Sequence, residues 1–244
     1  MERSSLTMQV KEFAGSLGAG LVGVADANRV AEVEPVPERR PEFFLPGARC
    51  VVVIGLKMVD AIMDRLRGLK DQYDETLIGY LRHYNYATLD LIACRTARFL
   101  EDQGWDAYPI QARMTDKDEY SAVFSHKPAA VVAGLGVRGK HGLVVTPEFG
   151  PRVRFVSVIT DAPLECAGPG VEKPSSVCGS CHVCIDLCPG KAIEEPGPDG
   201  TPRHDRDRCL AIYKQYRCAL CQGACPKGKA AAAARRRRKG APAV

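Results

Sequence analysis

The N-terminal part of the chain has the apolar spacing of helices that alternate with buried strands. A helix is predicted over 7–18, with Met8, Phe13 and Leu17 as candidates for its buried side. Continuous apolar, β-branched runs predict strands at 21–25 and 50–56. Between these strands, residues 31–49 are rich in proline and charge, which predicts a long surface connection.

The middle of the chain continues this pattern. One long helix or two shorter helices are predicted over 72–103, and Gly104 follows as a C-terminal cap. A short strand over 105–110 and a helix over 129–133 come next. The order of helices and strands predicts a mixed α/β (α+β) fold.

Two further apolar runs lie on either side of the turn at 147–151. The runs at 143–146 and 153–159 predict strands, and the short proline- and glycine-containing turn predicts that they form a hairpin. A proline- and glycine-rich linker then begins. We therefore expect a core over 1–167, a cysteine-rich domain over 168–229 and a disordered basic tail over 230–244.

Composition and charge exclude several classes of protein. The 244 residues are 45% hydrophobic and 26% charged, as in ordinary globular proteins. No apolar run approaches the roughly 20 residues of a membrane helix, and no secretory signal is found, so we expect a cytoplasmic protein. Seven basic residues after position 226 account for the net charge of +5, so the basic character belongs to the tail. The tail could attract RNA or a partner protein, but a solubilising role is the simpler interpretation.

Cysteine is the unusual component of the sequence. Eight of the eleven cysteines lie between positions 178 and 225, whereas Cys50, Cys94 and Cys166 are scattered. Cys50 and Cys94 lie in apolar elements and are expected in the core, and Cys166 is expected to be a spare thiol in a loop. Clustered cysteines in a cytoplasmic chain indicate metal binding rather than a disulfide scaffold.

The spacing of the first cysteine run, Cys178-x2-Cys181-x2-Cys184-x3-Cys188-Pro189, is that of bacterial ferredoxins. In that run the fourth cysteine binds the other cluster. The second set has only Cys218-x2-Cys221-x3-Cys225-Pro226, so its missing ligand must come from upstream. We therefore predict two [4Fe-4S] clusters, with these ligand sets: Cys178, Cys181, Cys184 and Cys225 for the first, and Cys188, Cys209, Cys218 and Cys221 for the second.

Structural zinc is the main alternative, because eight thiolates could hold two zinc ions. The x2-x2-x3-Pro spacing and the exchanged fourth ligand favour iron–sulfur clusters. His182 and His204 lie near the predicted clusters, but cysteines already fill every ligand position, so we expect both histidines to be solvated.

Other stretches resemble the epoxyqueuosine reductase and reductive dehalogenase superfamily. The resemblance covers most of residues 8–226 and is carried by residues 20–26 (GLVGVAD), 100–109 (LEDQGWDAYP), 133–143 (AGLGVRGKHGL), 146–154 (TPEFGPRVR) and 160–164 (TDAPL), and by a ferredoxin domain at the end. It implies a nitroreductase-like core that binds cobalamin, a corrinoid, with the two clusters supplying electrons. FMN in the same slot is the less favoured cofactor.

The resemblance also suggests where the cofactor would lie. A large planar ring needs a wall without side chains, and glycines allow backbone to approach it. The expected cofactor-binding residues are Gly134, Leu135, Gly136, Gly139, Lys140 and His141. A tight turn without a ligand, ending in a solvated Lys140-His141 loop, is the plainer interpretation of the same residues.

The sequence departs from the family where the proton donor is expected. Epoxyqueuosine reductases have an Asp-Thr-Ala-Pro segment before the glycine turn, whereas this chain has Met114-Thr-Asp-Lys-Asp-Glu-Tyr-Ser121. The catalytic residue is therefore unknown, with Asp116, Tyr120 and Tyr84 as weak candidates. Tyrosines at helical spacing, such as Tyr80, Tyr84 and Tyr86, are more often core residues.

Two functions follow from these observations. The first is an iron–sulfur, cobalamin-dependent reductase acting on a small-molecule or tRNA-borne substrate, with ferredoxin or flavodoxin as electron donor. The second is an electron-transfer protein, or an activator of a corrinoid protein, without substrate chemistry of its own. The missing Asp motif favours the second, whereas about 165 residues outside the ferredoxin domain favour the first.

Overall fold

The computed structural model describes residues 3–66, 75–113, 122–168, 177–216 and 218–238. The chain forms two compact units, each built from separate stretches of sequence. The first unit contains Met1–Leu56, Tyr84–Leu135 and Arg154–Val171, and the second contains Lys57–His83, Gly136–Val153 and Glu172–Val244. The second unit thus includes two stretches that lie upstream of the boundary predicted near residue 167.

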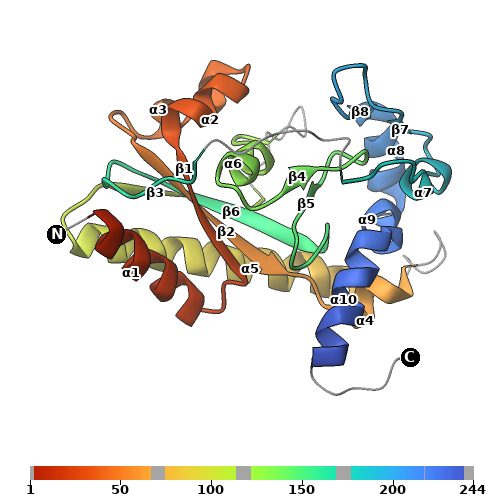
Figure 1. The fold of residues 1–244 in the computed structure, drawn as a ribbon, viewed down its shortest axis with the longest axis horizontal. Helices are drawn as coiled ribbons and strands as arrows, with labels where there is room; N and C mark the ends of the chain where they lie inside the picture. The colour runs from red at the N-terminus through yellow and green to blue at the C-terminus, as the bar shows by residue number, and fades with distance from the viewer. Residues whose placement is uncertain (1–2, 67–74, 114–121, 169–176, 217, 239–244) are drawn as a thin grey trace. The chain divides into compact units, whose positions relative to one another are not determined.

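A four-stranded sheet in the order β1-β2-β6-β3 forms the centre of the first unit (Figure 1). β1 pairs antiparallel with β2, and β3 pairs antiparallel with β6. β2 and β6 are buried along most of their length because they are the central strands. The strand bounds are Leu21–Asp26 for β1, Cys50–Lys57 for β2, Ala107–Ile110 for β3 and Val153–Thr160 for β6.

Two helices, α1 (Arg3–Ser16) and α5 (Glu75–Asp102), cover one face of this sheet (Figure 1). Their buried side chains join alternate residues of the strands in one hydrophobic core. α5 is a single helix, and Gly104 follows it with a φ of 85°, as expected of a glycine C-terminal cap. The core contains Leu6, Val10 and Ala14 of α1 and Leu89, Ile92, Ala93, Ala97 and Leu100 of α5.

The predicted buried side of α1 was wrong in part. Met8 has 56% of its surface exposed, whereas Leu6, Val10 and Ala14 are buried. The buried residues also repeat every four positions, and two of them are leucine and valine, which bury well against the strands. The sequence thus predicted the helix but not which of its sides is buried.

The opposite face of the sheet carries α6 (His126–Val132), whose residues Ala129 to Val132 are buried. A Cβ on Gly23 of β1 would lie 2.9 Å from both the Ala133 carbonyl oxygen and the Leu135 side chain, so glycine allows this close packing. The connection at 31–49 is more ordered than predicted, because it contains the end of α2 (Ala27–Val33), the 3₁₀ helix η1 (Pro37–Arg39) and α3 (Pro41–Phe44).

The predicted hairpin between 143–146 and 153–159 does not form. β5 (Val144–Val145) pairs with β4 (Val137–Arg138) in a separate two-stranded sheet, whereas β6 belongs to the main sheet. Arg152 lies between the two strands and is completely buried. The connection at Arg152 is thus buried in the second unit and does not form a hairpin turn between β5 and β6.

The second unit contains short elements around the cysteines. Their bounds are α4 (Asp60–Arg65), α7 (Val183–Asp186), β7 (Ile193–Glu194), β8 (Arg203–His204), α8 (Arg206–Tyr216), α9 (Leu220–Ala224) and α10 (Pro226–Arg238). β7 and β8 form an antiparallel pair. Met58, Met63 and Leu66 form a small core of their own, against which Ala219 packs.

The last helix extends further toward the C-terminus than predicted. α10 extends through the five alanines to Arg238, although 230–244 was expected to be disordered. Pro226 suits the first turn of a helix, alanine has the highest helix propensity, and Ala232 is buried. None of the helices in the described part of the chain is long and apolar enough to cross a membrane.

Candidate metal centre

The first group of thiols comes from the loop before α7 and from the end of α9. Cys184 is the buried residue of α7, and Cys225 is the C-cap residue of α9. Burial, followed by the nearby thiols of Cys178, Cys225 and Cys181, raises the pKa of Cys184 to about 11. Cys225 is therefore near the first cysteine run, although 37 residues or more separate it from that run in the sequence.

The second group of thiols lines one cavity. Cys188, Cys209, Cys218 and Cys221 all contribute to its wall, together with the apolar residues Ile193, Ile212 and Leu220. Burial, followed by the thiols of Cys218, Cys209, Cys184 and Cys188, raises the pKa of Cys221 to about 12. Cys184 belongs to the first group, so the two groups adjoin.

A close approach of two segments brings Cys188 toward Cys209. Gly190 lies against α8, where a Cβ would be 3.0 Å from the Arg208 carbonyl oxygen. The backbone N–H of Asp205 also donates to the carbonyl of Ala192, at 2.8 Å. Glycine at position 190 thus allows the turn after Cys188 to pack on the helix that carries Cys209.

Backbone N–H groups surround several of the thiols. The N–H of Lys140 donates to the sulfur of Cys178 at 3.5 Å, and the N–H of Ala192 donates to that of Cys188 at 3.2 Å. Such bonds stabilise thiolates and tune the potential of a cluster that they hold. Among the described residues, no group of three or more His, Cys, Asp or Glu side chains has the arrangement of a single-ion site.

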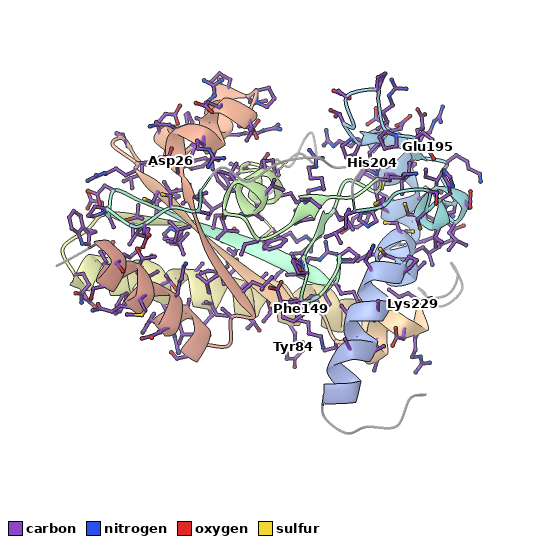
Figure 2. The ribbon with its side chains drawn as sticks, viewed as in Figure 1. Asp26, Tyr84, Phe149, Glu195, His204 and Lys229 are labelled. Atoms are coloured by element: carbon purple, nitrogen blue, oxygen red, sulfur yellow. The ribbon has the colours of Figure 1, made fainter. Side chains whose placement is uncertain are left out.

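A charged cluster lies beside the first group of thiols. The buried Lys140 ammonium group is 3.0 Å from Glu195, and Glu195 also contacts the His182 ring at 2.7 Å. Glu195 follows β7, and His204 lies on the paired strand β8 (Figure 2). His182 and His204 are at the surface, as expected, but Lys140 and His141 are each only 5% exposed and do not form a solvated loop.

The glycine turn packs on the chain itself. Gly134 has a φ of 72° and ends α6, and Leu135 lies against Gly23. A Cβ on Gly136 would be 2.5 Å from the Val145 carbonyl oxygen, and one on Gly139 would be 3.4 Å from the Cys178 sulfur. A Cβ added at Gly136 or Gly139 would thus meet protein atoms, and corrinoid binding at the turn stays a prediction.

Substituting Gly136 should therefore destabilise the protein without any ligand. We expect Gly136→Ala to lower the free energy of unfolding by about 1–3 kcal/mol, because the added methyl group meets backbone. Gly15→Ala is the matched control, because a Cβ at Gly15 has no neighbour within 4 Å. The free energy of unfolding of both variants is measured in urea without cobalamin. This packing would be contradicted if Gly136→Ala were as stable as Gly15→Ala.

The chain is similar in sequence to proteins of two related kinds. It is 25% identical to the epoxyqueuosine reductase of Bacillus cereus over 94% of this chain and 66% of the relative. It is 27% identical to the tetrachloroethene reductive dehalogenase of Sulfurospirillum multivorans over 91% of this chain and 50% of the relative. This chain is a homologue of the epoxyqueuosine reductases and reductive dehalogenases. It spans about two thirds of the length of the Bacillus relative. No family model matches the chain.

Solved structures of both kinds have the same fold. A catabolic reductive dehalogenase in complex with 3-bromo-4-hydroxybenzoic acid matches with a TM-score of 0.72 and 20% identity, over 93% of this chain and 32% of that one. The epoxyqueuosine reductase of Streptococcus thermophilus matches with a TM-score of 0.66 and 20% identity, over 92% of this chain and 66% of that one. The mixed α/β fold of this homologue is thus that of its redox-enzyme relatives.

The predicted catalytic residues of this homologue are only partly described. Asp116 and Tyr120 lie outside the described residues, as does the side chain of Tyr80. Tyr84 (Figure 2) is on α5 with 64% of its surface exposed, so it is not a core residue. Tyr86 is half-buried, and the Arg154 guanidinium lies 5.9 Å from the centre of its ring. The assignment of a proton donor stays a prediction.

Sequence analysis did not single out His126, at the start of α6. Its Nε2 is 3.1 Å from the Gln111 carbonyl oxygen, and its Nδ1 is 2.9 Å from the Ser157 hydroxyl. Burial lowers its pKa to about 4, although the hydrogen bond to Gln111 opposes this. A neutral ring fits these partners, because Nε2 can donate to the carbonyl while Nδ1 accepts from the hydroxyl.

This histidine should make stability depend on pH. Its pKa is lower in the folded state than its ordinary 6.5, so the unfolded chain takes up the proton first as the pH falls. The stability that the neutral ring contributes is complete above pH 6.5 and is lost as the pH falls toward 4. At pH 5 the free energy of unfolding should already be lower by about 2 kcal/mol. Urea unfolding at pH 7 and pH 5 should show that His126→Gln loses less of its free energy of unfolding between these two pH values than the wild type does. Equal losses in the two proteins would contradict this assignment.

Proposed function

We propose that this chain is an iron–sulfur oxidoreductase that passes electrons through two [4Fe-4S] clusters to a corrinoid. The observation that carries the proposal is the grouping of the eight thiols, in which Cys225 lies with the first cysteine run. That exchange of the fourth cysteine is typical of two-cluster ferredoxins. The homologues are redox enzymes, which agrees with this function.

The residues present fit two clusters. The first would be held by Cys178, Cys181, Cys184 and Cys225, and the second by the four thiols that line the cavity. Four thiolates for each cluster are the usual donor set of a cubane, and the apolar wall of the cavity would keep water from the second cluster. The clusters, when bound, would supply one-electron transfer, and the adjoining of the two thiol groups supports electron exchange between them.

The polar groups around the thiols would tune this transfer. The Lys140 backbone N–H is directed at the Cys178 sulfur, and its side chain brings a buried positive charge that Glu195 partly balances. Both features favour the more negatively charged, reduced form of a nearby cluster. The second group has an N–H bond of its own, from Ala192 to the Cys188 sulfur, so the buried charge of Lys140 is what distinguishes the first group.

The corrinoid part of the proposal rests on the homologues. One solved reductive dehalogenase of this fold is described as suggesting a mechanism for B12-dependent dehalogenation. When bound, a corrinoid supplies a cobalt centre for reductive chemistry. Its predicted place at the glycine turn stays a proposal, although a Cβ added at Gly136 or Gly139 would meet protein atoms.

The substrate class follows from the same relatives. One neighbour was solved with an epoxyqueuosine-modified tRNA stem loop, and another with a halogenated hydroxybenzoic acid. We propose a tRNA-borne or small organic substrate, a ferredoxin or flavodoxin donor, and a cytoplasmic location. Asp116 and Tyr120 are the proposed proton donors, because they lie shortly before the glycine turn in the sequence.

Titration with cob(II)alamin tests this function. Cluster-replete protein is titrated anaerobically, and electron paramagnetic resonance follows the splitting from the lower nitrogen ligand of cobalt. Loss of that splitting on binding, together with cobalt reduction by dithionite-reduced clusters, is the expected result. No change at high micromolar cobalamin would remove the corrinoid, and would leave an electron-transfer protein or an FMN enzyme.

A further inference from the structure

Two cysteines outside the metal centre meet in the first unit. Cys50 is the first residue of β2, and Cys166 lies in the segment that follows β6. Their sulfur atoms are 3.4 Å apart, although 116 positions separate them in the sequence. Cys50 is a core residue, as expected, whereas Cys166 is not the spare loop thiol that the sequence suggested.

Hydrogen bonds hold Cys166 in place. The N–H of Glu165 donates to the Thr7 hydroxyl at 2.7 Å, and the N–H of Ala167 donates to the Val24 carbonyl at 2.8 Å. Arg29 also donates to the Ala167 carbonyl at 3.4 Å. The residues on both sides of Cys166 are thus tied to the helix α1, the strand β1 and the helix α2, which fixes the thiol next to Cys50.

A cavity of about 390 Å³ opens onto this pair. Its volume is within the range of small-molecule sites, about 300–1,000 Å³. Asp26 at the end of β1 is part of the wall (Figure 2), as are Arg49 and Glu165. Cys50 and Cys166 both line the cavity, so a small polar molecule in it would lie beside this pair.

The two thiols are not equivalent. The hydrogen bond with Cys166 lowers the pKa of Cys50 most. Burial and the Asp26 carboxylate raise this pKa, whereas the Leu164 backbone and Arg49 lower it. The same hydrogen bond raises the pKa of Cys166 well above its ordinary value. Cys50 is therefore the better nucleophile, because the thiolate is the reactive form, and Cys166 keeps its proton until a later step.

We propose that Cys50 and Cys166 are a dithiol–disulfide pair that reacts with a low-molecular-mass disulfide in this cavity. The Cys50 thiolate attacks one sulfur of that disulfide, forms a mixed disulfide and releases the first small thiol. Cys166, after losing its proton, attacks the Cys50 sulfur and releases the second small thiol. The two protein thiols lose two electrons and two protons, and the small disulfide is reduced to two thiols.

The geometry allows the final bond with little rearrangement. The sulfurs are 3.4 Å apart and must approach to about 2 Å, which is within reach of side-chain rotation. The site shares no residue with the predicted metal centre, because both cysteines belong to the first unit and the eight predicted ligands belong to the second. Its redox state can therefore change without the loss of a cluster ligand.

Thiol trapping in a glutathione redox buffer tests the proposal. Anaerobic, cluster-replete protein is equilibrated with increasing ratios of oxidised to reduced glutathione, alkylated, digested and analysed by mass spectrometry. The expected product is a disulfide-linked peptide pair that contains Cys50 and Cys166. Cys94, in the same unit and also partly accessible, should stay alkylated and serves as the internal control.

Single variants resolve the order of the two steps. In Cys166→Ser, glutathione should accumulate on Cys50, because the resolving thiol is missing. In Cys50→Ser, Cys166 should carry no more glutathione than Cys94, because the Cys50 thiolate that attacks the small disulfide is missing. A far-ultraviolet circular dichroism spectrum and a urea midpoint like those of the wild type show that each variant is folded. The proposal is overturned if folded wild type gives no linked peptide at any ratio, or if Cys50 in Cys166→Ser reacts no more than Cys94.

Discussion

Cys225→Ala is expected to remove the first cluster, and with it about four of about eight irons. Cys225 lies with the first cysteine run, although it follows Cys221 by only four positions. A cubane without its fourth thiolate is exposed to loss of iron. Paramagnetic resonance of the reduced variant should therefore lack the same signal that is absent from Cys178→Ala.

Two controls make this result specific. Cys218→Ala should remove the other signal, because Cys218 lines the cavity of the second group. Cys94→Ala should keep both signals, because Cys94 belongs to the first unit and the eight predicted ligands belong to the second. If Cys225→Ala had the spectrum of Cys218→Ala instead, the assignment of Cys225 to the first cluster would be wrong.

Arg152→Met is expected to lower the free energy of unfolding by about 3–5 kcal/mol, which is typical when one partner of a buried ion pair is removed. The Arg152 side chain is completely buried. Its guanidinium contacts Asp60 at 3.2 Å and Asp64 at 2.7 Å, and it donates to the Gly223 carbonyl at 3.1 Å. Without the cation, Asp64 loses its ion pair with Arg152, and the α9 carbonyl loses its Arg152 donor. Asp60 keeps its ion pair with Lys57 at 2.8 Å.

Urea unfolding of anaerobic protein, followed by circular dichroism, measures this effect. Arg154→Met is the matched control, because Arg154 is half-buried and contacts the Tyr86 ring at 5.9 Å; its loss should cost about 1 kcal/mol or less. Adding Asp64→Asn to Arg152→Met should restore part of the stability by removing one unbalanced charge. A loss under 1 kcal/mol for Arg152→Met would show that the ion pairs contribute little.

The sequence predicted elements whose signal is local. The apolar run at 50–56 is β2, and the long periodic segment ended by Gly104 is α5. The ligand sets of the clusters could also be proposed from spacing, because the exchange of the fourth cysteine is a property of the motif itself. For β2 and α5 the deciding residues lie close together in the chain, whereas for the clusters a motif supplies the pairing of distant cysteines.

Partners that are distant in sequence could not be predicted. β6 pairs with β2 and β3 rather than with the nearby β5, because two-residue periodicity does not identify a neighbouring strand. Cys50 and Cys166 meet across 116 positions. Arg152 lies in the stretch that resembles the family, but nothing in its neighbourhood indicates that a charged side chain would be buried between Asp60 and Asp64.

The central claim is that the eight clustered cysteines hold two [4Fe-4S] clusters. Iron, zinc and acid-labile sulfide are measured together on one sample of anaerobically prepared protein, with metal content expressed per chain. The structure and the cysteine spacing predict about eight irons and about eight sulfides, with zinc in trace amounts. About two zincs per chain without labile sulfide would contradict the account.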